Sequence, residues 1–264
     1  MMDGSYRFHG YGASVRVDAP VDIPLEALGS QVAPEVAGER WGEGPSDLHL
    51  TRWNGDFHLT YGERRYGPYR TMENALWGLS NAVHFVIGKR SPMTFLHAGA
   101  VEIDGQAVVF PGRSRWGKSM LVASLVEQGC GYLSDEYAVV STEGAVFPLS
   151  KPIRLRVGNE GNALNVGRKG ASAPGGFPCG AVILTRYVDG ATWRPEELTP
   201  GQAAFETLSA ALQSRDQPDQ VLNAVAALVR NAKCYRSSRG CGEPSAAMIR
   251  SFLGVENLSQ EARA

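Results

Sequence analysis

The segment from residue 112 to residue 119 constrains this chain more than any other. It reads Gly-Arg-Ser-Arg-Trp-Gly-Lys-Ser, which fills every fixed position of the pattern G-x-x-x-x-G-K-[ST]. A glycine-rich turn of this kind points several backbone N–H groups into one concavity, and the helix N-terminus that follows adds partial positive charge. The pattern therefore predicts a P-loop that binds phosphate between a strand and a helix. The alternative is an ordinary strand–turn–helix corner with a surface lysine.

The sequence on both sides of this segment supports the strand and the helix. Before it, the apolar runs 100–103 and 106–110 flank an Asp-Gly pair, which is a strong hairpin signal. After it, apolar residues at helical spacing predict a helix over 119–128, which Gly129 ends. Because the strand before the loop is one arm of a local hairpin, we predict a mixed or antiparallel sheet.

Composition indicates an ordinary globular protein. The chain has 264 residues, of which 43% are hydrophobic and 20% charged, and a net charge of −1. It shows no basic excess, no apolar stretch of membrane-spanning length and no secretion signal in its first residues. We therefore expect a cytoplasmic protein with neither a nucleic-acid nor a membrane partner. The four cysteines lack metal-ligand spacing and are expected to be thiols, with a Cys234–Cys241 disulfide as the alternative.

We divide the chain into two parts. Residues 1–90 carry no recognisable chemical motif and are predicted to form a small α+β domain, a candidate for recognising the substrate. Its predicted strands are 11–17, 49–53 and 56–61, and its predicted helices are 23–32 and 71–89. Residues 91–264 contain the P-loop. There we predict strands 138–141, 145–149, 153–157, 181–188 and 234–237, helices 201–214, 218–231 and 245–253, and a long glycine-rich loop over 158–178.

A pair of acids follows the predicted helix. Asp135 and Glu136 stand at the end of a short predicted strand, one helix after Ser119. Acids in this position beside a P-loop can hold Mg²⁺ or accept a proton from an attacking hydroxyl; an unspecialised surface pair is the alternative. Lys118 can reach the β- and γ-phosphates of a nucleotide, and the Ser119 hydroxyl can ligate Mg²⁺. These residues predict an ATP and Mg²⁺ site.

The predicted nucleotide-binding residues form one continuous segment. They are Gly112, Arg113, Ser114, Arg115, Trp116, Gly117, Lys118, Ser119 and Met120. Arg113, Arg115 and Arg168 are candidates for neutralising phosphate charge, as are Arg154 and Arg156, which share one strand face that is otherwise simply solvated. His97 lies among apolar residues, where a histidine is more often part of the core than a catalyst.

Together these residues resemble the HPr kinase/phosphorylase family. The match consists of Leu96-His97-Ala98-Gly99, the Asp-Gly hairpin, the P-loop, Gly129 and Leu133-Ser134-Asp135-Glu136, and it covers roughly residues 93–157. The resemblance implies an α/β fold with a mixed sheet, similar to the nucleotide-binding part of phosphoenolpyruvate carboxykinase. It also implies ATP- and Mg²⁺-dependent phosphorylation of a serine hydroxyl on a protein. By position, Lys118 looks like the phosphate-binding lysine, Ser119 and Glu136 the metal-binding residues, Asp135 the general base and His97 the active-site histidine.

Several features depart from the family pattern. Arg115-Trp116 replaces the usual Gly-x; the arginine is expected to need an ordinary backbone angle, and the bulky pair is expected to narrow the site. Glu136 replaces an aspartate, and the N-terminal part does not resemble the family's regulatory domain. We therefore expect neither HPr as the acceptor nor the reverse, phosphorolytic reaction. The chain looks more like the divergent HPr-kinase-related proteins, some of which phosphorylate a serine of a ribosomally made peptide such as a lasso-peptide precursor.

We therefore expect a serine kinase that uses ATP and Mg²⁺ and acts on a peptide or small protein. A small-molecule kinase is one alternative and differs only in the acceptor. A nucleotide-binding protein or ATPase without phosphoryl transfer is another. The Arg115-Trp116 pair favours loss of transfer, whereas His97 and Asp135 favour its retention. Some members of the family form ring-like oligomers, so a homo-oligomer is an open expectation.

Overall fold

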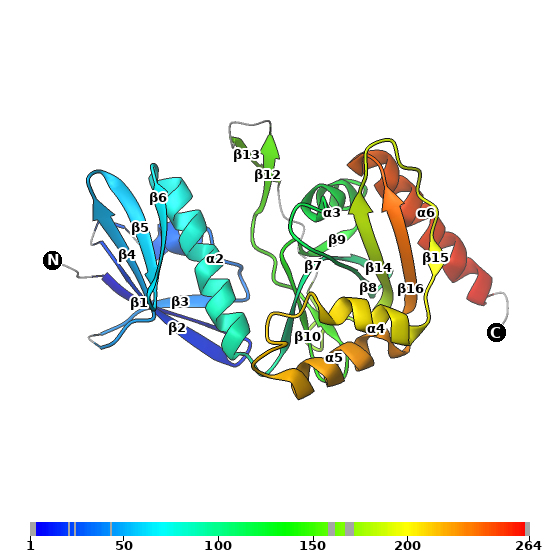
Figure 1. Cartoon of the computed structure of the whole chain (residues 1–264), viewed down its shortest axis with the longest axis horizontal. Helices are drawn as coiled ribbons and strands as arrows, with labels where there is room; N and C mark the ends of the chain where they lie inside the picture. The colour runs from blue at the N-terminus through cyan, green and yellow to red at the C-terminus, as the bar shows by residue number, and fades with distance from the viewer. Residues whose placement is uncertain are drawn as a thin grey trace. The chain divides into compact units, whose positions relative to one another are not determined.

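The computed structural model describes residues 4–20, 22–23, 25–42, 44–157, 162–166 and 172–261. The chain separates into two compact units, Met1–Met93 and Thr94–Ala264, each with its own sheet (Figure 1). This division lies close to the boundary drawn from the sequence between residues 90 and 91. Within the described residues, no helix combines the length and the apolar character that crossing a bilayer requires.

The first unit is a six-stranded sheet with two helices. Its strand order is β3-β1-β2-β4-β5-β6, in which β2 and β4 are parallel and every other neighbouring pair is antiparallel. The strands are β1 Gly4–Gly10, β2 Ala13–Ala19, β3 Ala37–Arg40, β4 Leu48–Trp53, β5 Asp56–Tyr61 and β6 Arg64–Tyr69, and the helices are α1 Leu25–Gly29 and α2 Met72–Arg90.

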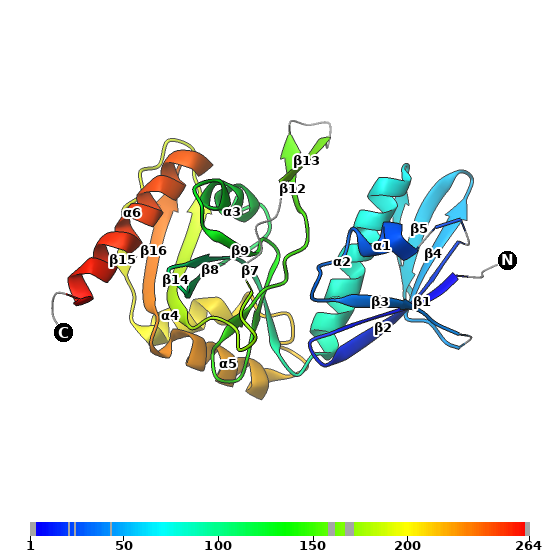
Figure 2. The ribbon, with the colours of Figure 1, turned by 180° about the vertical axis from the view of Figure 1, so that it is seen from behind.

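One face of this sheet is apolar and packs against α2. Tyr6 and Phe8 on β1 and Val15 and Val17 on β2 are buried, and the residues between them are more exposed. Because side chains alternate across a strand, burying one face leaves the other face polar. Figure 2 shows α2 running along this sheet. The helix begins at Met72, and the Thr71 hydroxyl oxygen caps its first turn by accepting from the Asn74 N–H.

Local signals in the first unit predicted some elements and missed others. The predicted hairpin is confirmed as β4 and β5, and the predicted helix 71–89 is confirmed as α2. The strand expected over 11–17 begins only at Ala13, because Tyr11 and Gly12 form a left-handed turn after the unpredicted β1. The helix expected over 23–32 is reduced to the short α1.

The second unit contains an eight-stranded mixed sheet. The order is β11-β10-β7-β8-β14-β16-β15, with β9 also paired to β7. The pairs β8/β14 and β14/β16 are parallel and the others antiparallel, so the expected mixed sheet is confirmed. The strands are β7 Thr94–Ile103, β8 Gln106–Pro111, β9 Gly131–Ser134, β10 Tyr137–Val140, β11 Val146–Phe147, β14 Cys179–Tyr187, β15 Glu196–Glu197 and β16 Lys233–Arg239.

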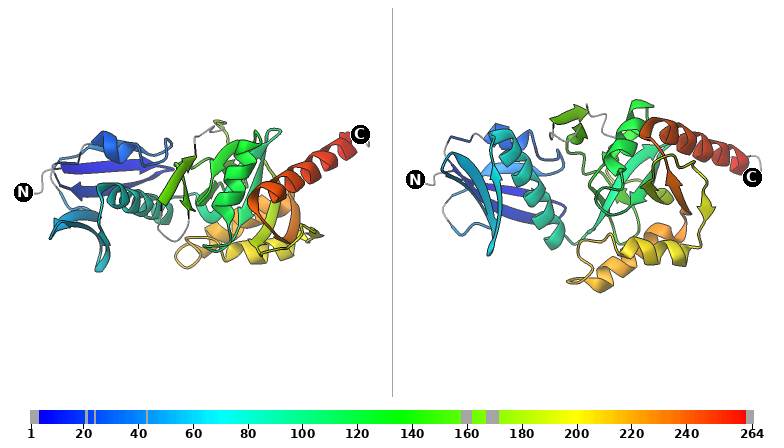
Figure 3. Two further views of the ribbon diagram at one scale, coloured as in Figure 1. Left: turned by 90° about the horizontal axis from the view of Figure 1, so that it is seen from above. Right: turned by 45° about the horizontal axis from the view of Figure 1, so that its top comes forward.

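Helices cover both faces of this sheet and make a three-layer α/β/α unit. The helices α3 Lys118–Glu127 and α6 Gly242–Glu261 lie side by side over the face that contains Val101 and Ile183 (Figure 3). The helices α4 Pro200–Leu208 and α5 Pro218–Arg230 cover the face that contains Leu96 and Leu184. A separate two-stranded sheet joins β12 Ile153–Val157 to β13 Asn162–Val166.

The structure corrects two expectations for this unit. The helix predicted over 201–214 ends at Leu208, because the chain then pairs with β7: Leu96 and Ala211 form a bridge, and the Leu212 N–H donates to the Phe95 carbonyl at 2.9 Å. The loop predicted over 158–178 contains the strand β13. Its last part, 172–178, is a loop in which Phe177 forms a bridge with Val146, and 158–161 and 167–171 lie outside the described residues. All four cysteines are unpaired thiols, as expected, so the alternative disulfide is absent.

Candidate functional site

The parallel strands of the second unit bring three distant segments to one edge of the sheet. The strand β8 ends at Pro111 before the 112–119 loop, β14 ends at Tyr187 and β16 ends at Arg239. In open α/β sheets, ligands bind outside such carboxyl ends. We therefore expect a ligand-binding site at this edge of the sheet.

The strand β7 ties the predicted site segments together. It runs between β8 and β10, so His97 lies within a strand rather than before one. The Gly112 N–H donates to the His97 carbonyl at 3.2 Å, and the Ala98 N–H donates to the Glu136 carbonyl at 3.1 Å. Backbone pairing thus places the acid turn and the start of the 112–119 loop on opposite sides of one short stretch of β7.

The 112–119 loop has a strained backbone. Gly117 caps the N-terminus of α3 with a left-handed φ of 76°, and Arg115 has a left-handed φ of 69°. The expectation of an ordinary backbone angle at Arg115 was wrong: the loop takes the turn in spite of the Cβ, at a cost of about 1–2 kcal/mol. The Trp116 ring packs over Gly112, where an added Cβ would lie 2.8 Å from a ring carbon.

Lys118 is a buried cation at the start of α3. Its side chain is 6% exposed, and its ammonium group donates to the carbonyls of Gly112 at 2.8 Å and Arg113 at 2.9 Å. Burial lowers the pKa of Lys118 to about 8, although the nearby Asp135 and Glu136 act to raise it. A buried lysine with neutral hydrogen-bond partners is well suited to gain an anionic ligand.

Asp135 is a buried carboxylate held in place by hydroxyl groups. The Tyr132 hydroxyl donates to it at 3.1 Å, and the Ser119 side chain also hydrogen-bonds to it. Burial raises the pKa of Asp135, and neighbouring Glu136 adds to the increase, whereas Lys151 and the two hydroxyls oppose it. A carboxylate with a raised pKa binds a proton more readily than an ordinary aspartate, as a general base requires.

The turn that presents Asp135 and Glu136 is fixed from both sides. The Ser134 hydroxyl oxygen accepts from the N–H groups of Glu136 at 3.2 Å and Tyr137 at 3.0 Å. Glu136 forms an ion pair with Lys151, a lysine that is only 2% exposed. Sequence reasoning missed Lys151, because nothing in its neighbourhood marks it as different from a surface lysine between two strands.

His97 is half-buried and uncharged at neutral pH. Burial lowers its pKa to about 4, and Lys118 contributes to the decrease, whereas Glu136 and a hydrogen bond with the Gly112 backbone oppose it. Its ring lies 6.1 Å from the Tyr137 ring, centroid to centroid. A neutral imidazole in this position can donate or accept a hydrogen bond but supplies no positive charge.

A cavity of about 570 Å³ opens beside the loop. Its walls include His97, Gly112, Trp116, Leu184, Phe205 and Glu206. Phe205 on α4 is 78% exposed and gives this cavity an apolar wall. The volume falls within the range of small-ligand pockets, about 300–1,000 Å³.

The oxygen ligands beside the loop are few, which fits Mg²⁺ better than a metal ion that needs three or four protein ligands. Across the described ranges, no three His, Cys, Asp or Glu side chains gather as a metal cluster. Mg²⁺ commonly takes one or two carboxylates and completes its shell with phosphate oxygens and water. The Ser119 hydroxyl, hydrogen-bonded to Asp135, and the adjacent Glu136 carboxylate offer such a partial set.

The other predicted site residues lie as follows. Arg113, Ser114, Arg115 and Met120 are exposed on the loop and the first turn of α3, and Arg154 lies on β12. The side chains of Arg156 and Arg168 lie outside the described residues. One residue that no motif marked contacts the loop directly: Arg239, 1% exposed, donates to the carbonyls of Gly117 at 2.6 Å and Trp116 at 3.2 Å.

Comparison with models of protein families and with curated proteins found no match for this chain. Among solved structures, the chain is similar to the HPr(Ser) kinase/phosphatase from Coxiella burnetii. The alignment covers 63% of this chain and 98% of that chain, with 13% sequence identity and a TM-score of 0.35.

Proposed function

We propose that this protein is an ATP-dependent phosphotransferase that acts on a hydroxyl group, here a serine of a peptide or small protein. The observation that carries the proposal is the convergence of Lys118, Ser119 and Asp135 at the carboxyl edge of one sheet. The N-terminus of α3 and the buried Lys118 ammonium group can bind an anion. The buried Asp135 carboxylate lies within hydrogen-bond reach of the Ser119 hydroxyl.

The nucleotide phosphates are held by the amides of the 112–119 loop and by Lys118. Ligand phosphate oxygens take the place of the Gly112 and Arg113 carbonyls as partners of the Lys118 ammonium group. Ser119 and Glu136 are the residues that would hold Mg²⁺, and the ion would neutralise part of the phosphate charge. The ion pair with Lys151 holds the Glu136 carboxylate in place for this role.

Asp135 acts as the base for the acceptor. The serine oxygen attacks the γ-phosphorus, the bond between that phosphorus and the β–γ bridging oxygen breaks, and ADP leaves. The serine proton passes to the Asp135 carboxylate, whose raised pKa favours the transfer. His97, neutral and beside Gly112, hydrogen-bonds the transferring group or the acceptor.

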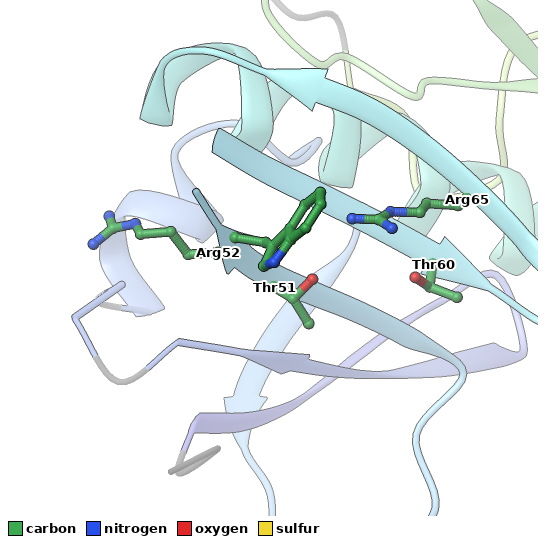
Figure 4. Close-up of a pocket in the computed structure, with 5 residues that line it drawn as sticks. Thr51, Arg52, Thr60 and Arg65 are labelled. Atoms are coloured by element: carbon green, nitrogen blue, oxygen red, sulfur yellow. The ribbon is translucent and has the colours of Figure 1, made fainter. Parts of the chain in front are cut away.

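Two surface cavities favour an acceptor that is larger than a simple alcohol. The cavity beside the loop offers the apolar Trp116 and Phe205 to acceptor side chains. In the first unit, a groove of about 450 Å³ is lined by Thr51, Arg52, Trp53, Thr60 and Arg65 (Figure 4). Trp53 is 61% exposed, and the Arg65 guanidinium lies 5.5 Å from its ring centroid. We propose that this groove binds an acidic part of the acceptor.

A small-molecule kinase is the second candidate function. The cavity beside the loop is large enough to enclose a small acceptor, and it adjoins His97 and Gly112. It would then contain the reacting hydroxyl itself, and the groove of the first unit would have no part in the reaction.

Nucleotide binding by two variants tests the assignment of the site. Lys118→Ala should weaken the affinity for Mg-ATP by about tenfold or more, because it removes a charged contact to phosphate worth about 1.5–3 kcal/mol. Asp135→Asn should bind Mg-ATP nearly as tightly as the wild type, because Asp135 serves the acceptor. Isothermal titration calorimetry gives both values. Unchanged affinity in Lys118→Ala would remove the basis for a nucleotide site at this loop.

A further inference from the structure

Arg239 is a buried cation without an acidic partner. Its guanidinium lies at the end of β16, and burial lowers its pKa. Its hydrogen bonds go to the carbonyls of Trp116, Gly117 and Gly240, and within the described chain no carboxylate forms an ion pair with it and its Nε has no partner. A buried charge of this kind costs several kcal/mol, so an isolated structural role explains it poorly.

The two loop carbonyls that Arg239 binds determine where two amides point. The Trp116 carbonyl and the Gly117 N–H belong to one peptide unit, and the Gly117 carbonyl and the Lys118 N–H belong to the next. In a planar trans peptide, the C=O and N–H groups point in opposite directions. By holding both carbonyls on its own side, Arg239 directs the two N–H groups to the other side, where the first amides of α3 have no helical partner.

Further contacts fix the same carbonyls. The Tyr187 N–H donates to the Trp116 carbonyl, and the Leu121 N–H donates to the Gly117 carbonyl, each at 3.1 Å. Gly117 also lies so close to Arg239 that an added Cβ would be 2.8 Å from its Nη2. The end of β16 and the start of α3 are therefore locked together at the point where the loop turns.

We propose that Arg239 is a positioning residue for a bound polyphosphate, an inference that rests on the proposed function. It aims the Gly117 and Lys118 amides at the phosphates before the ligand arrives. It also places an uncompensated positive charge behind the loop, where low dielectric makes attraction of an anion strong. The binding of the polyphosphate then offsets the cost of burying the guanidinium.

The binding of Mg-ATP and of magnesium pyrophosphate to the full chain tests this role. Arg239→Met should weaken both affinities by about tenfold or more, which is about 1.4 kcal/mol. The affinity of Arg239→Lys should lie between those of the wild type and Arg239→Met. An ammonium group keeps the positive charge, but it lacks the second guanidinium nitrogen that donates to the Gly240 carbonyl while Nη2 binds the two loop carbonyls. Arg230→Met is the matched control, since it removes an exposed arginine from α5 in the same unit, and it should bind like the wild type.

Thermal unfolding of each variant distinguishes a residue that positions the loop amides for a ligand from one that only stabilises the fold. A purely stabilising role would lower the melting temperature of Arg239→Met and leave the affinity of the folded protein for both ligands unchanged. That result would overturn the inference. If Arg239→Met does not fold, Arg239→Lys decides: wild-type affinity overturns the role, and weaker binding of both ligands supports it. Failure of the wild type to bind either ligand would overturn the proposed function and this inference together.

Discussion

Burial moves the pKa values of Lys118 and Asp135 toward neutrality from opposite directions. The lysine is lowered to about 8, and the aspartate is raised. The charge of Asp135 opposes the decrease in the pKa of Lys118. A cation and a carboxylate that both titrate closer to neutral pH than usual are typical of a functional site.

The lowered pKa of Lys118 predicts a pH dependence for nucleotide binding. We expect the affinity for ATP to fall as the pH rises through about 8, because the lysine then loses the charge that attracts phosphate. The decrease approaches about tenfold per pH unit when this group alone controls binding. Calorimetric titrations on both sides of this pH measure it, and Lys118→Ala should lose the dependence. A wild-type affinity that stays constant across this range would contradict the assignment.

Sequence could identify only the site residues that local motifs mark. Lys118, Ser119 and Asp135 lie in or near one motif, and the chain joins them through a single helix. Lys151 and Arg239 have no such mark. Parallel pairing of β16 with β14 and of β14 with β8 brings Arg239 to the loop from more than a hundred residues away. Its role depends on this pairing and therefore could not be read from the residues themselves.

At the scale of elements, the loop between β8 and α3 keeps its shape at a cost. Arg115 occupies a left-handed conformation that glycine adopts freely and that an arginine resists. Hydrogen bonds hold the loop at both of its ends. Lys118 donates to the Gly112 and Arg113 carbonyls, and Arg239 donates to the Trp116 and Gly117 carbonyls. The neighbouring hydrogen bonds therefore impose the turn on Arg115.

Relief of this strain should be measurable as stability. Arg115→Gly should raise the free energy of unfolding by about 0.5 kcal/mol, because removing a strain of about 1–2 kcal/mol outweighs the greater unfolded-state entropy of glycine. Arg113→Gly is the control in the same loop: Arg113 has no positive φ, so this change should lower stability by about 0.5–1 kcal/mol. Urea unfolding compares the two, and an equal loss in both variants would contradict the strain.

Elements with local signals were predictable, and elements defined by tertiary contacts were not. The Asp104-Gly105 turn specified the hairpin of β7 and β8, because both residues take left-handed angles in the expected way. In contrast, every residue of β3 is exposed, so its sequence lacks the alternation that marks a strand. Helix α4 stops early only because the following residues pair with β7, and helical spacing carries no information on that contact.

At the scale of the whole molecule, the two units have different characters. The second unit carries the buried lysine, the buried carboxylate and the cavity beside the loop. The first carries a groove lined by an exposed tryptophan and two arginines. We infer that the two units bind different reactants: the second unit binds the nucleotide, and the first binds part of the acceptor.

This division predicts separable effects. The double substitution Trp53→Ala and Arg65→Ala should leave the affinity for ATP unchanged and reduce phosphoryl transfer to the acceptor by about tenfold or more, as for a central aromatic and arginine contact. Arg40→Ala, which removes an exposed arginine from β3 in the same unit, should transfer normally. Transfer from labelled ATP at limiting acceptor measures the effect. Wild-type transfer by the double variant would exclude the groove from acceptor binding.

The most direct test of the account is phosphoryl transfer itself. Purified wild-type protein and Asp135→Asn are incubated side by side with γ-labelled ATP, Mg²⁺ and a lysate of the native organism. The account predicts a labelled protein or peptide that appears only with the wild type, since Asp135 takes the acceptor's proton. Release of labelled free phosphate alone, or the same labelled products with both proteins, would contradict it.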